Sequence, residues 1–462
     1  MPDSNLRSRQ REAPRARSAD LGFADLLPAG RINDALRAEG VSWRHKVFTP
    51  AVTVWAFLAQ VLNPDRSCRA AVARVLAGLI GTGRRPCRPA TGAYCKARAR
   101  LGEAVPRRLA REAGRALHRR AAPDWLWHGR RVKVVDGTTV SMPDTPANQR
   151  EYPQPTVQKP GLGFPIARAV VVFCLATGVA LDAALARCRG KRTGESSLLR
   201  ELADALEPGD VVLADRGFGS FYELAWWRSR GVDVAVRLHQ ARRADFRTGR
   251  RLGREDHVVV WAKPDRPPWV DDELFAALPR KLSVREVGVR VAEPGFRTRH
   301  LVVATTLTDA AGYPAASLAD LYRARWQAEL DLRSLKVTLG LDVLRCKTPE
   351  MVRAEFWMHL LGYNLIREAL AEASAGAGRV PRELSFAGAV QAVCAFGAWQ
   401  ACCPSRAADL RRGLLAMIGC QRVGNRPNRA EPRARKRRPK HGALLTVPRD
   451  RARAQLRRAI SA

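Results

Sequence analysis

Hydrophobic residues in the first quarter of the chain recur at the spacing of amphipathic helices. The runs Thr49–Leu62, Ser67–Gly81 and Val105–Arg120 follow this pattern, and the last carries arginines around an apolar side. An arginine-rich helix can be a solvated face or a phosphate-contacting one, and the pattern leaves both open. With the polar, arginine-rich arm that precedes it, this part is predicted to be a helical N-terminal DNA-binding region, residues 1–125.

Near residue 126 the pattern changes to short apolar runs that alternate with helical segments. The expected order is three strands and then helix, strand, helix, strand, which predicts an α/β domain. The strands are expected at residues 131–135, 166–175, 179–186, 211–214 and 232–238, and the helices at 196–206 and 220–230.

Residues 240–306 interrupt this alternation with proline, arginine and short alternating runs. They predict a β-rich insertion whose last strand can rejoin the core. A long helix is expected at 318–339, because a capping-box pattern precedes it and Gly340 follows it. Further helices are expected at 351–373 and 386–400. The domain of the alternating strands and helices is therefore assigned residues 126–375, and a helical C-terminal region with a basic tail residues 376–462.

The charge of the chain adds an expected class of partner to this outline. Eighty Lys and Arg residues against 44 Asp and Glu give a net charge of +36 over 462 residues. A GC-rich genome changes which cation is used but does not obviously create such a surplus. A field of this sign favours a polyanion, and nucleic acid is the commonest one. The segment 421–440 holds nine of these cations and one acid, so most of the surplus belongs to the rest of the chain.

Other classes of protein are disfavoured by the sequence. The ten cysteines form no C-x-x-C pair and have no histidine at zinc-ligand spacing. The first residues contain no apolar signal core, and the most apolar stretch, Ala169–Ala186, is broken by a Thr-Gly turn and by Asp182. We therefore expect no membrane span, and a cytoplasmic, nucleoid-associated protein.

Two aspartates come directly after two of the expected strands. Asp136 follows Val-Val in VVDGTT, and Asp215 follows a buried run in VLADRGF. Each could be an ordinary turn residue when taken alone. Side by side in one sheet, however, two such aspartates can share a divalent cation such as Mg²⁺, which prefers oxygen ligands.

The long helix supplies a third group of polar residues. Tyr322, Arg325, Glu329 and Lys336 project within about 60° of one another at about 100° per residue. A helix face that packs against a core would be apolar, so packing does not explain this stripe, although a solvated face can look like this by chance.

The stripe, Tyr-x2-Arg-x3-Glu-x6-Lys, resembles the signature of the insertion-sequence-four family of bacterial DDE transposases. The segments Asp136-Gly-Thr-Thr and Asp215-Arg-Gly-Phe resemble that family's first and second aspartate motifs, and the resemblance covers most of the chain. It implies a ribonuclease-H-like catalytic core with a β-rich insertion, between helical N-terminal and C-terminal regions.

The resemblance also implies an activity, a cofactor and partners. The enzyme would excise and integrate an insertion sequence by hydrolysis and strand transfer at double-stranded terminal inverted repeats, as a homodimer that bridges two ends. Asp136, Asp215 and Glu329 would hold two Mg²⁺ ions, with Mn²⁺ able to substitute. Tyr322, Arg325 and Lys336 would hold DNA phosphates.

Several further residues have two interpretations. Arg216 and Lys159 are candidate DNA contacts, the first next to an aspartate and the second in a Gly/Pro loop. Glu195 precedes a helix, and a capping role is favoured over a metal role. Trp261 and Trp269 could hold a flipped base, as in some relatives, but packing aromatics of the insertion are favoured.

Two other functions remain open from the sequence. One is a nuclease on the same fold that hydrolyses DNA without strand transfer. The other is a catalytically inactive DNA-binding protein descended from a transposase, which would have lost at least one carboxylate.

Overall fold

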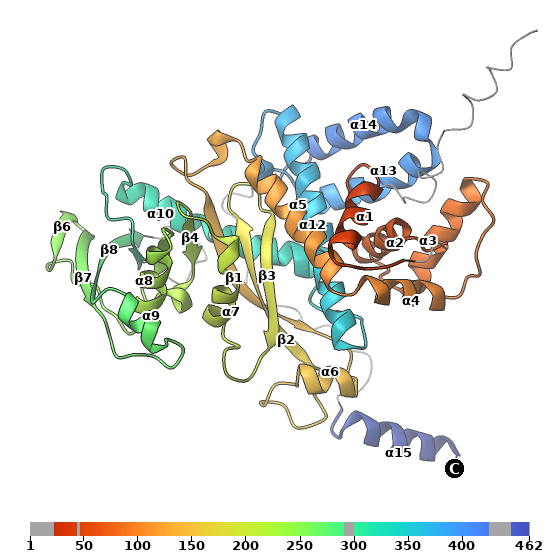
Figure 1. Ribbon diagram of the computed structural model, residues 1–462, viewed down its shortest axis with the longest axis horizontal. Coiled ribbons are helices and arrows are strands. Elements are labelled where there is room, and N and C mark those ends of the chain that lie inside the picture. The colour runs from red at the N-terminus through yellow and green to blue at the C-terminus, as the bar shows by residue number, and fades with distance from the viewer. Residues whose placement is uncertain (1–22, 44–46, 291–299, 425–444, 462) are drawn as a thin grey trace, which may run out of the picture. The chain divides into compact units, whose positions relative to one another are not determined.

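The computed structural model describes residues 23–43, 47–290, 300–424 and 445–461. The chain divides into two compact units, Met1–Ala113 with Ala354–Val423 and Gly114–Arg353 with Gly424–Ala462 (Figure 1). The expected N-terminal arm and most of the basic tail lie outside the described residues. The boundaries expected from the sequence, 125/126 and 375/376, remain a prediction about domains.

The first unit is helical, as its periodicity predicts. Thr49 caps α2 and Ser67 caps α3, each by accepting a hydrogen bond from a backbone N–H of the first turn. The side chain of Gln60 on the buried helix α2 accepts hydrogen bonds from Tyr94 and Arg98. The helices of this unit are α1 (Ala29–Ala38), α2 (Pro50–Leu62), α3 (Cys68–Gly81), α4 (Gly92–Leu101), α13 (Phe386–Cys402) and α14 (Ala407–Cys420), together with parts of α5 (Ala104–Arg119) and α12 (Pro349–Gly376).

The second unit is built on one nine-stranded sheet with the order β3-β2-β1-β4-β5-β9-β8-β7-β6. Strands β1, β4 and β5 are parallel to one another, and every other neighbouring pair is antiparallel. The strands are β1 (Val132–Ser141), β2 (Ile166–Cys174), β3 (Ala180–Arg187), β4 (Val211–Ala214), β5 (Asp233–Arg237), β6 (Arg250–Gly253), β7 (Asp256–Ala262), β8 (Lys281–Arg290) and β9 (His300–Thr305).

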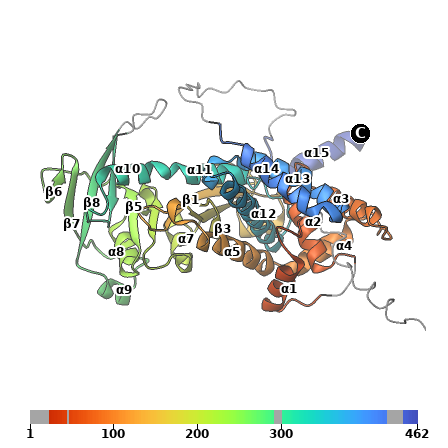
Figure 2. The ribbon, with the colours of Figure 1, turned by 90° about the horizontal axis from the view of Figure 1, so that it is seen from above.

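The helices of this unit cover both sides of the sheet. Figure 2 shows α7 (Glu195–Glu201) and α8 (Phe221–Ser229) on one side, and α10 (Ala315–Ala324) and α11 (Trp326–Arg333) on the other. An ion pair between Arg200 and the buried Glu223 joins α7 to α8. Three shorter or peripheral helices complete the unit: α6 (Pro146–Glu151), α9 (Asp272–Ala277) and α15 (Arg449–Ser461).

The first strand is longer than the sequence suggested. We expected it to end before Asp136, but β1 continues to Ser141. The reason is its partner β2, which pairs with β1 from Lys133 as far as Ser141 and so supplies hydrogen bonds beyond the aspartate. The parallel pairing with β4, by contrast, covers only residues 132–134 of β1.

The insertion is not a separate small domain. Its strands extend the core sheet, because β9 pairs with β5 on one side and with β8 on the other. The completely buried Arg285 of β8 holds this extension through a two-pronged ion pair with Asp256, with N–O distances of 2.7 and 2.6 Å. Its remaining nitrogen donates to the carbonyl of Tyr313 at 2.6 Å, near the start of α10. The expected return of the last insertion strand to the core is thus confirmed.

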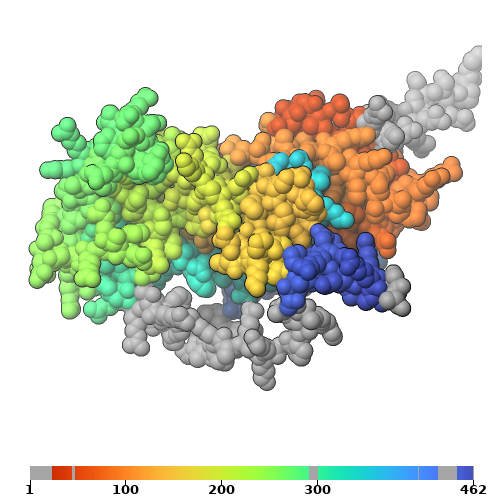
Figure 3. Space-filling model, turned by 90° about the horizontal axis from the view of Figure 1, so that it is seen from below, coloured from red at the N-terminus to blue at the C-terminus, as the bar shows by residue number. Residues whose placement is uncertain are grey.

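The C-terminal helix α15 packs on the segment between β1 and β2. Figure 3 shows its surface against that of residues around 145–165. Arg449 pairs with Asp144 at 3.4 Å, and its guanidinium lies 4.6 Å from the ring centroid of Phe164. No helix in the described part of the chain is long and apolar enough to cross a membrane.

Removing the Arg285 side chain tests this account of the sheet extension. Arg285→Met leaves the Asp256 carboxylate buried without its partner, so we expect the free energy of unfolding to fall by about 3–5 kcal/mol. Urea denaturation followed by circular dichroism measures it. The control is Arg247→Met, whose pair with Asp245 is exposed and should be worth less than about 1 kcal/mol. Equal losses in the two variants would contradict the proposed role of Arg285.

Candidate active site

The parallel pairing of β1 with β4 brings the two aspartates to the same level of the sheet. Val132 pairs with Val211 and Val134 with Leu213, so extending this register by two residues sets Asp136 opposite Asp215. Adjacent strands lie about 4.8 Å apart, and residues at matching positions of parallel strands point to the same face. Both side chains are partly exposed at this point.

Helix α11 and the turn that follows it pack over the same part of β1. Lys336 donates a hydrogen bond from Nζ to the hydroxyl oxygen of Thr138 at 3.0 Å. Thr138 stands two residues after Asp136 in β1, so the two side chains share one face of the sheet. Lys336 therefore reaches the face that carries the first aspartate.

The third carboxylate lies on this helix, beside an arginine. Arg325 donates from Nη2 to Oε1 of Glu329 at 2.9 Å, one helical turn away. Arg325 also interacts electrostatically with Asp136, Asp215 and Tyr322. One guanidinium thus stands among all three candidate carboxylates.

The expected long helix is interrupted twice. A break at Arg325 separates α10 from α11, and Ser334–Thr338 forms a π-helical turn that contains Lys336. The Ser334 hydroxyl donates to the carbonyl of Leu330 at 2.9 Å, a local bond of the kind that perturbs helices. The spacing of the polar residues alone does not predict these interruptions. Turns of the π type occur frequently at functional sites.

Burial is the main cause of the raised pKa values of Asp136 and Tyr322. Burial raises the pKa of Asp136 to about 6; the Gly137 N–H and Arg325 oppose this, while the charges of Glu329 and Glu195 add to it. Burial likewise raises the pKa of Tyr322 to about 12, with a further rise from Asp215. At neutral pH the Tyr322 phenol is therefore a hydrogen-bond donor and not a base.

The two remaining candidates lie at the edge of this group or away from it. Arg216 follows Asp215 and is exposed, and it donates to the side-chain oxygen of Gln240 at 3.2 Å. Lys159 lies in the loop before β2. The first residue of β2 pairs with Ser141, at the end of β1. That end of the strand is about 17 Å from Asp136, at about 3.4 Å per residue.

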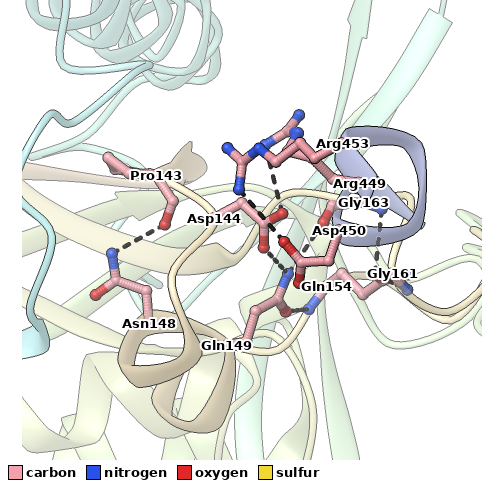
Figure 4. A network of polar contacts seen from close by, with 10 residues as sticks. All are labelled: Pro143, Asp144, Asn148, Gln149, Gln154, Gly161, Gly163, Arg449, Asp450 and Arg453. Atoms are coloured by element: carbon pink, nitrogen blue, oxygen red, sulfur yellow. Dashed lines mark hydrogen bonds and ion pairs between the residues drawn. The ribbon is translucent and has the colours of Figure 1, made fainter. Parts of the chain in front are cut away.

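The loop of Lys159 is held by two glutamines, Gln149 and Gln154 (Figure 4), and Gln149 donates to the carbonyl of Gly163 at 3.0 Å. The Gln154 side chain donates to the carbonyl of Lys159 at 2.9 Å and accepts from the backbone N–H of Gly161 and Gly163. Residues of this loop and of α15 line a cavity of about 480 Å³. The backbone of Lys159 is therefore fixed next to α15.

Two tryptophans of the insertion have structural contacts. Trp261 is buried, and its indole N–H donates to Glu286 at 3.1 Å while Arg242 stacks on its ring. Trp269 is half-buried, with the guanidinium of Arg200 3.7 Å from its ring centroid. These contacts agree with packing as the favoured interpretation.

The chemistry of this group fits hard divalent cations. Its donors are carboxylate oxygens at a partly exposed strand level, which are the ligands that Mg²⁺ and similar ions prefer. In the described part of the chain no three acidic, histidine or cysteine side chains already converge as an ion would require. Arg325 instead neutralises Glu329, so binding of an ion would draw these carboxylates together.

An α/β sheet with one aspartate in a strand, a second directly after the adjacent parallel strand and a glutamate on a later helix defines a class of carboxylate-dependent phosphodiester enzymes. Comparison with known proteins agrees. The family model described as "Transposase DDE domain" matches residues 127–365, and "Insertion element 4 transposase N-terminal" matches residues 19–111. The chain belongs to this family, the DDE transposases of the insertion-sequence-four type.

Individual relatives support the assignment. Over 427 residues the chain is 29% identical to "Transposase InsG for insertion sequence element IS4" of Escherichia coli strain K12, which covers 90% of this chain and 92% of the relative. It is 28% identical over 287 residues to the transposase for insertion sequence element IS421 of Escherichia coli, covering 56% and 71%. A piggyBac transposase synaptic complex with hairpin DNA has a TM-score of 0.43 at 10% identity, covering 91% and 89%, a likeness too weak to bear on the site.

Three expectations from the sequence are thereby confirmed. The chain is a DNA transposase and hence an enzyme that cleaves and transfers DNA strands, and it has a ribonuclease-H-like core. Enzymes with this domain depend on divalent metal ions and bind DNA. The roles of individual residues are proposals, which follow below.

The raised pKa of Asp136 predicts how stability depends on pH. The pKa of Asp136 is about 6 in the folded protein, above its unfolded value of 3.8. Asp136 therefore stabilises the fold fully below the unfolded pKa, and this contribution to the free energy of unfolding is lost as the pH rises through about 6. Between about pH 5 and pH 7.5, metal-free wild type should lose about 1 kcal/mol more unfolding free energy than Asp136→Asn. Urea denaturation in EDTA measures this. The exposed Asp320→Asn should behave as wild type does, and an Asp136→Asn variant that also did so would disprove the shift.

Proposed function

We propose that Asp136, Asp215 and Glu329 together bind two Mg²⁺ ions, with Mn²⁺ able to substitute, and that this site cuts and rejoins DNA at the element's terminal inverted repeats. The observation that carries the proposal is the shared level of Asp136 and Asp215 in the sheet, with Glu329 joined to both through the charge of Arg325. Bound divalent ions would supply charge to activate the attacking oxygen and to stabilise the leaving one.

Arg325 has a double role in this proposal. Without a cation it neutralises Glu329 at 2.9 Å. If Glu329 held an ion instead, the guanidinium would be free to bind a DNA phosphate with two parallel N–H bonds. This exchange keeps the half-buried charges compensated in both states, since an unpaired charge in such a place is costly.

Lys336 and Tyr322 complete the phosphate contacts. The partner of Lys336 is the neutral hydroxyl of Thr138, so its positive charge is available to a phosphate. Tyr322 is kept protonated by its high pKa, so its hydroxyl can donate a hydrogen bond to a phosphate. We further propose that Arg216 and Lys159 contact the DNA outside the cleaved strand, with Lys159 fixed beside the basic helix α15.

The proposal extends to assembly and location. We propose residues 126–375 as the catalytic domain and the flanking helical regions as DNA-binding and assembly regions of a homodimer that holds two ends. Light scattering with end DNA tests this, and a single copy per complex would contradict it. Action at the chromosome, in association with the nucleoid, follows from the proposed substrate.

Replacing Glu329 tests the metal site. Glu329→Gln should bind a DNA duplex carrying the element's own end as wild type does, but should cut it about 10³-fold more slowly, because several kcal/mol of charge stabilisation are lost. Cleavage of labelled DNA with Mg²⁺ measures this. The matched control is Asp320→Asn, an exposed carboxylate on α10. Undiminished cutting by Glu329→Gln would place the third carboxylate elsewhere.

A joining assay separates the transposase activity from plain hydrolysis at the same site. Wild type given precleaved ends and target DNA should yield joined product. Hydrolysis without joined product would instead favour a nuclease.

Salt dependence tests the phosphate contacts. Lys336→Gln should reduce the log–log slope of end binding against salt concentration by about 0.9, the value for one phosphate contact. Fluorescence anisotropy between about 50 and 200 mM salt measures the slope. Arg247→Gln is the control, because Asp245 already neutralises that guanidinium. A slope that Lys336→Gln leaves unchanged would remove Lys336 from the DNA contacts.

A further inference from the structure

A fourth carboxylate lies next to Gly137, the strand residue after Asp136, and its charge interacts with that of Asp136 across the strand. Glu195 is the first residue of α7, and its side chain extends over Gly137 of β1. A Cβ atom built on Gly137 would lie 2.9 Å from Cγ of Glu195 and would overlap its carboxylate. The carboxylate thus fills the space that the absent side chain of Gly137 leaves.

Two hydrogen bonds hold the backbone around Glu195 in this place. Arg168 of β2 donates to the carbonyl of Thr193 at 2.8 Å. The Ser196 hydroxyl donates to the carbonyl of Gly217 at 3.0 Å, in the turn that follows Asp215. The residue between these anchors is therefore fixed between the strand of the first aspartate and the turn of the second.

The position is not explained by helix capping, which the sequence favoured for Glu195. The N-cap of α7 is Gly194, and no side chain caps this helix. Among the described residues none forms a hydrogen bond or an ion pair with the Glu195 carboxylate, which is exposed. Two neighbouring carboxylates repel each other unless a cation lies between them.

We propose that Glu195 is a fourth oxygen ligand of the metal site, on the side of Asp136. This inference rests on the proposed function, and it gives Gly137 a role: the absence of a side chain there lets Glu195 approach. Gly137 lies in a β-strand with no left-handed backbone, so an alanine fits the backbone, and the three atoms nearest to its Cβ would all belong to Glu195.

Mn²⁺ binding tests the proposal. The full-length protein with a precleaved duplex of the element's end is titrated with Mn²⁺, and free Mn²⁺ is measured by electron paramagnetic resonance. The Mn²⁺ bound by the DNA alone is subtracted. Glu195→Gln should weaken Mn²⁺ binding by about 10-fold or more, as does the loss of a side chain that binds or supports a metal ion. Gly137→Ala should weaken it as well, although every carboxylate is retained. The matched control is Glu201→Gln, an exposed carboxylate at the other end of α7, with wild-type binding expected.

Circular dichroism confirms that each variant is folded before the titration. Unchanged Mn²⁺ binding by Glu195→Gln, with binding lost in Asp136→Asn, would overturn this inference and leave the proposed function intact. Binding that neither substitution alters, or wild type that binds no Mn²⁺ beyond DNA alone, would overturn both.

Discussion

The site depends on one short stretch of parallel pairing, the three residue pairs that join β1 to β4. This pairing sets Asp136 level with Asp215, and it stops just before them, so the two carboxylates stand where the strands no longer bond to each other. On its other edge β1 continues to pair with β2, which keeps the backbone of Asp136, Gly137 and Thr138 extended.

The negative charges of these acids require nearby positive charges, and one segment, from Arg325 to Lys336, provides them. Arg325 neutralises Glu329 and moderates the rise in the pKa of Asp136, while Lys336 reaches the same strand through Thr138. The cations come from a segment in which Arg325 separates α10 from α11 and a π-turn contains Lys336. In the metal-free enzyme, the positive charges of Arg325 and Lys336 therefore lie where the proposed metal ions and DNA phosphates would bind.

Much of this could be predicted from the sequence, because strong local patterns decide it. The buried run before Asp215 and the polar stripe from Tyr322 to Lys336 both indicated the residues that the structure brings to one face. The end of β1 was predicted wrongly, since a Gly-Thr-Thr segment stays extended only because β2 lies beside it. The place of Glu195 was equally hidden: its approach to Gly137 depends on anchors from Arg168 and Gly217, which are 27 and more than 20 residues away in sequence and carry no local signal.

The site proposed above requires Asp136, Asp215 and Glu329 to converge on divalent ions. Crystals of the protein with a duplex of the element's end, soaked in Mn²⁺ and measured for anomalous scattering, test it most directly. The account predicts anomalous density between Asp136, Asp215 and Glu329, with two peaks about 4 Å apart and with Arg325 turned from Glu329 toward a phosphate. Ordered DNA at the site with Mn²⁺ density elsewhere, or with Glu329 still held by Arg325, would contradict it.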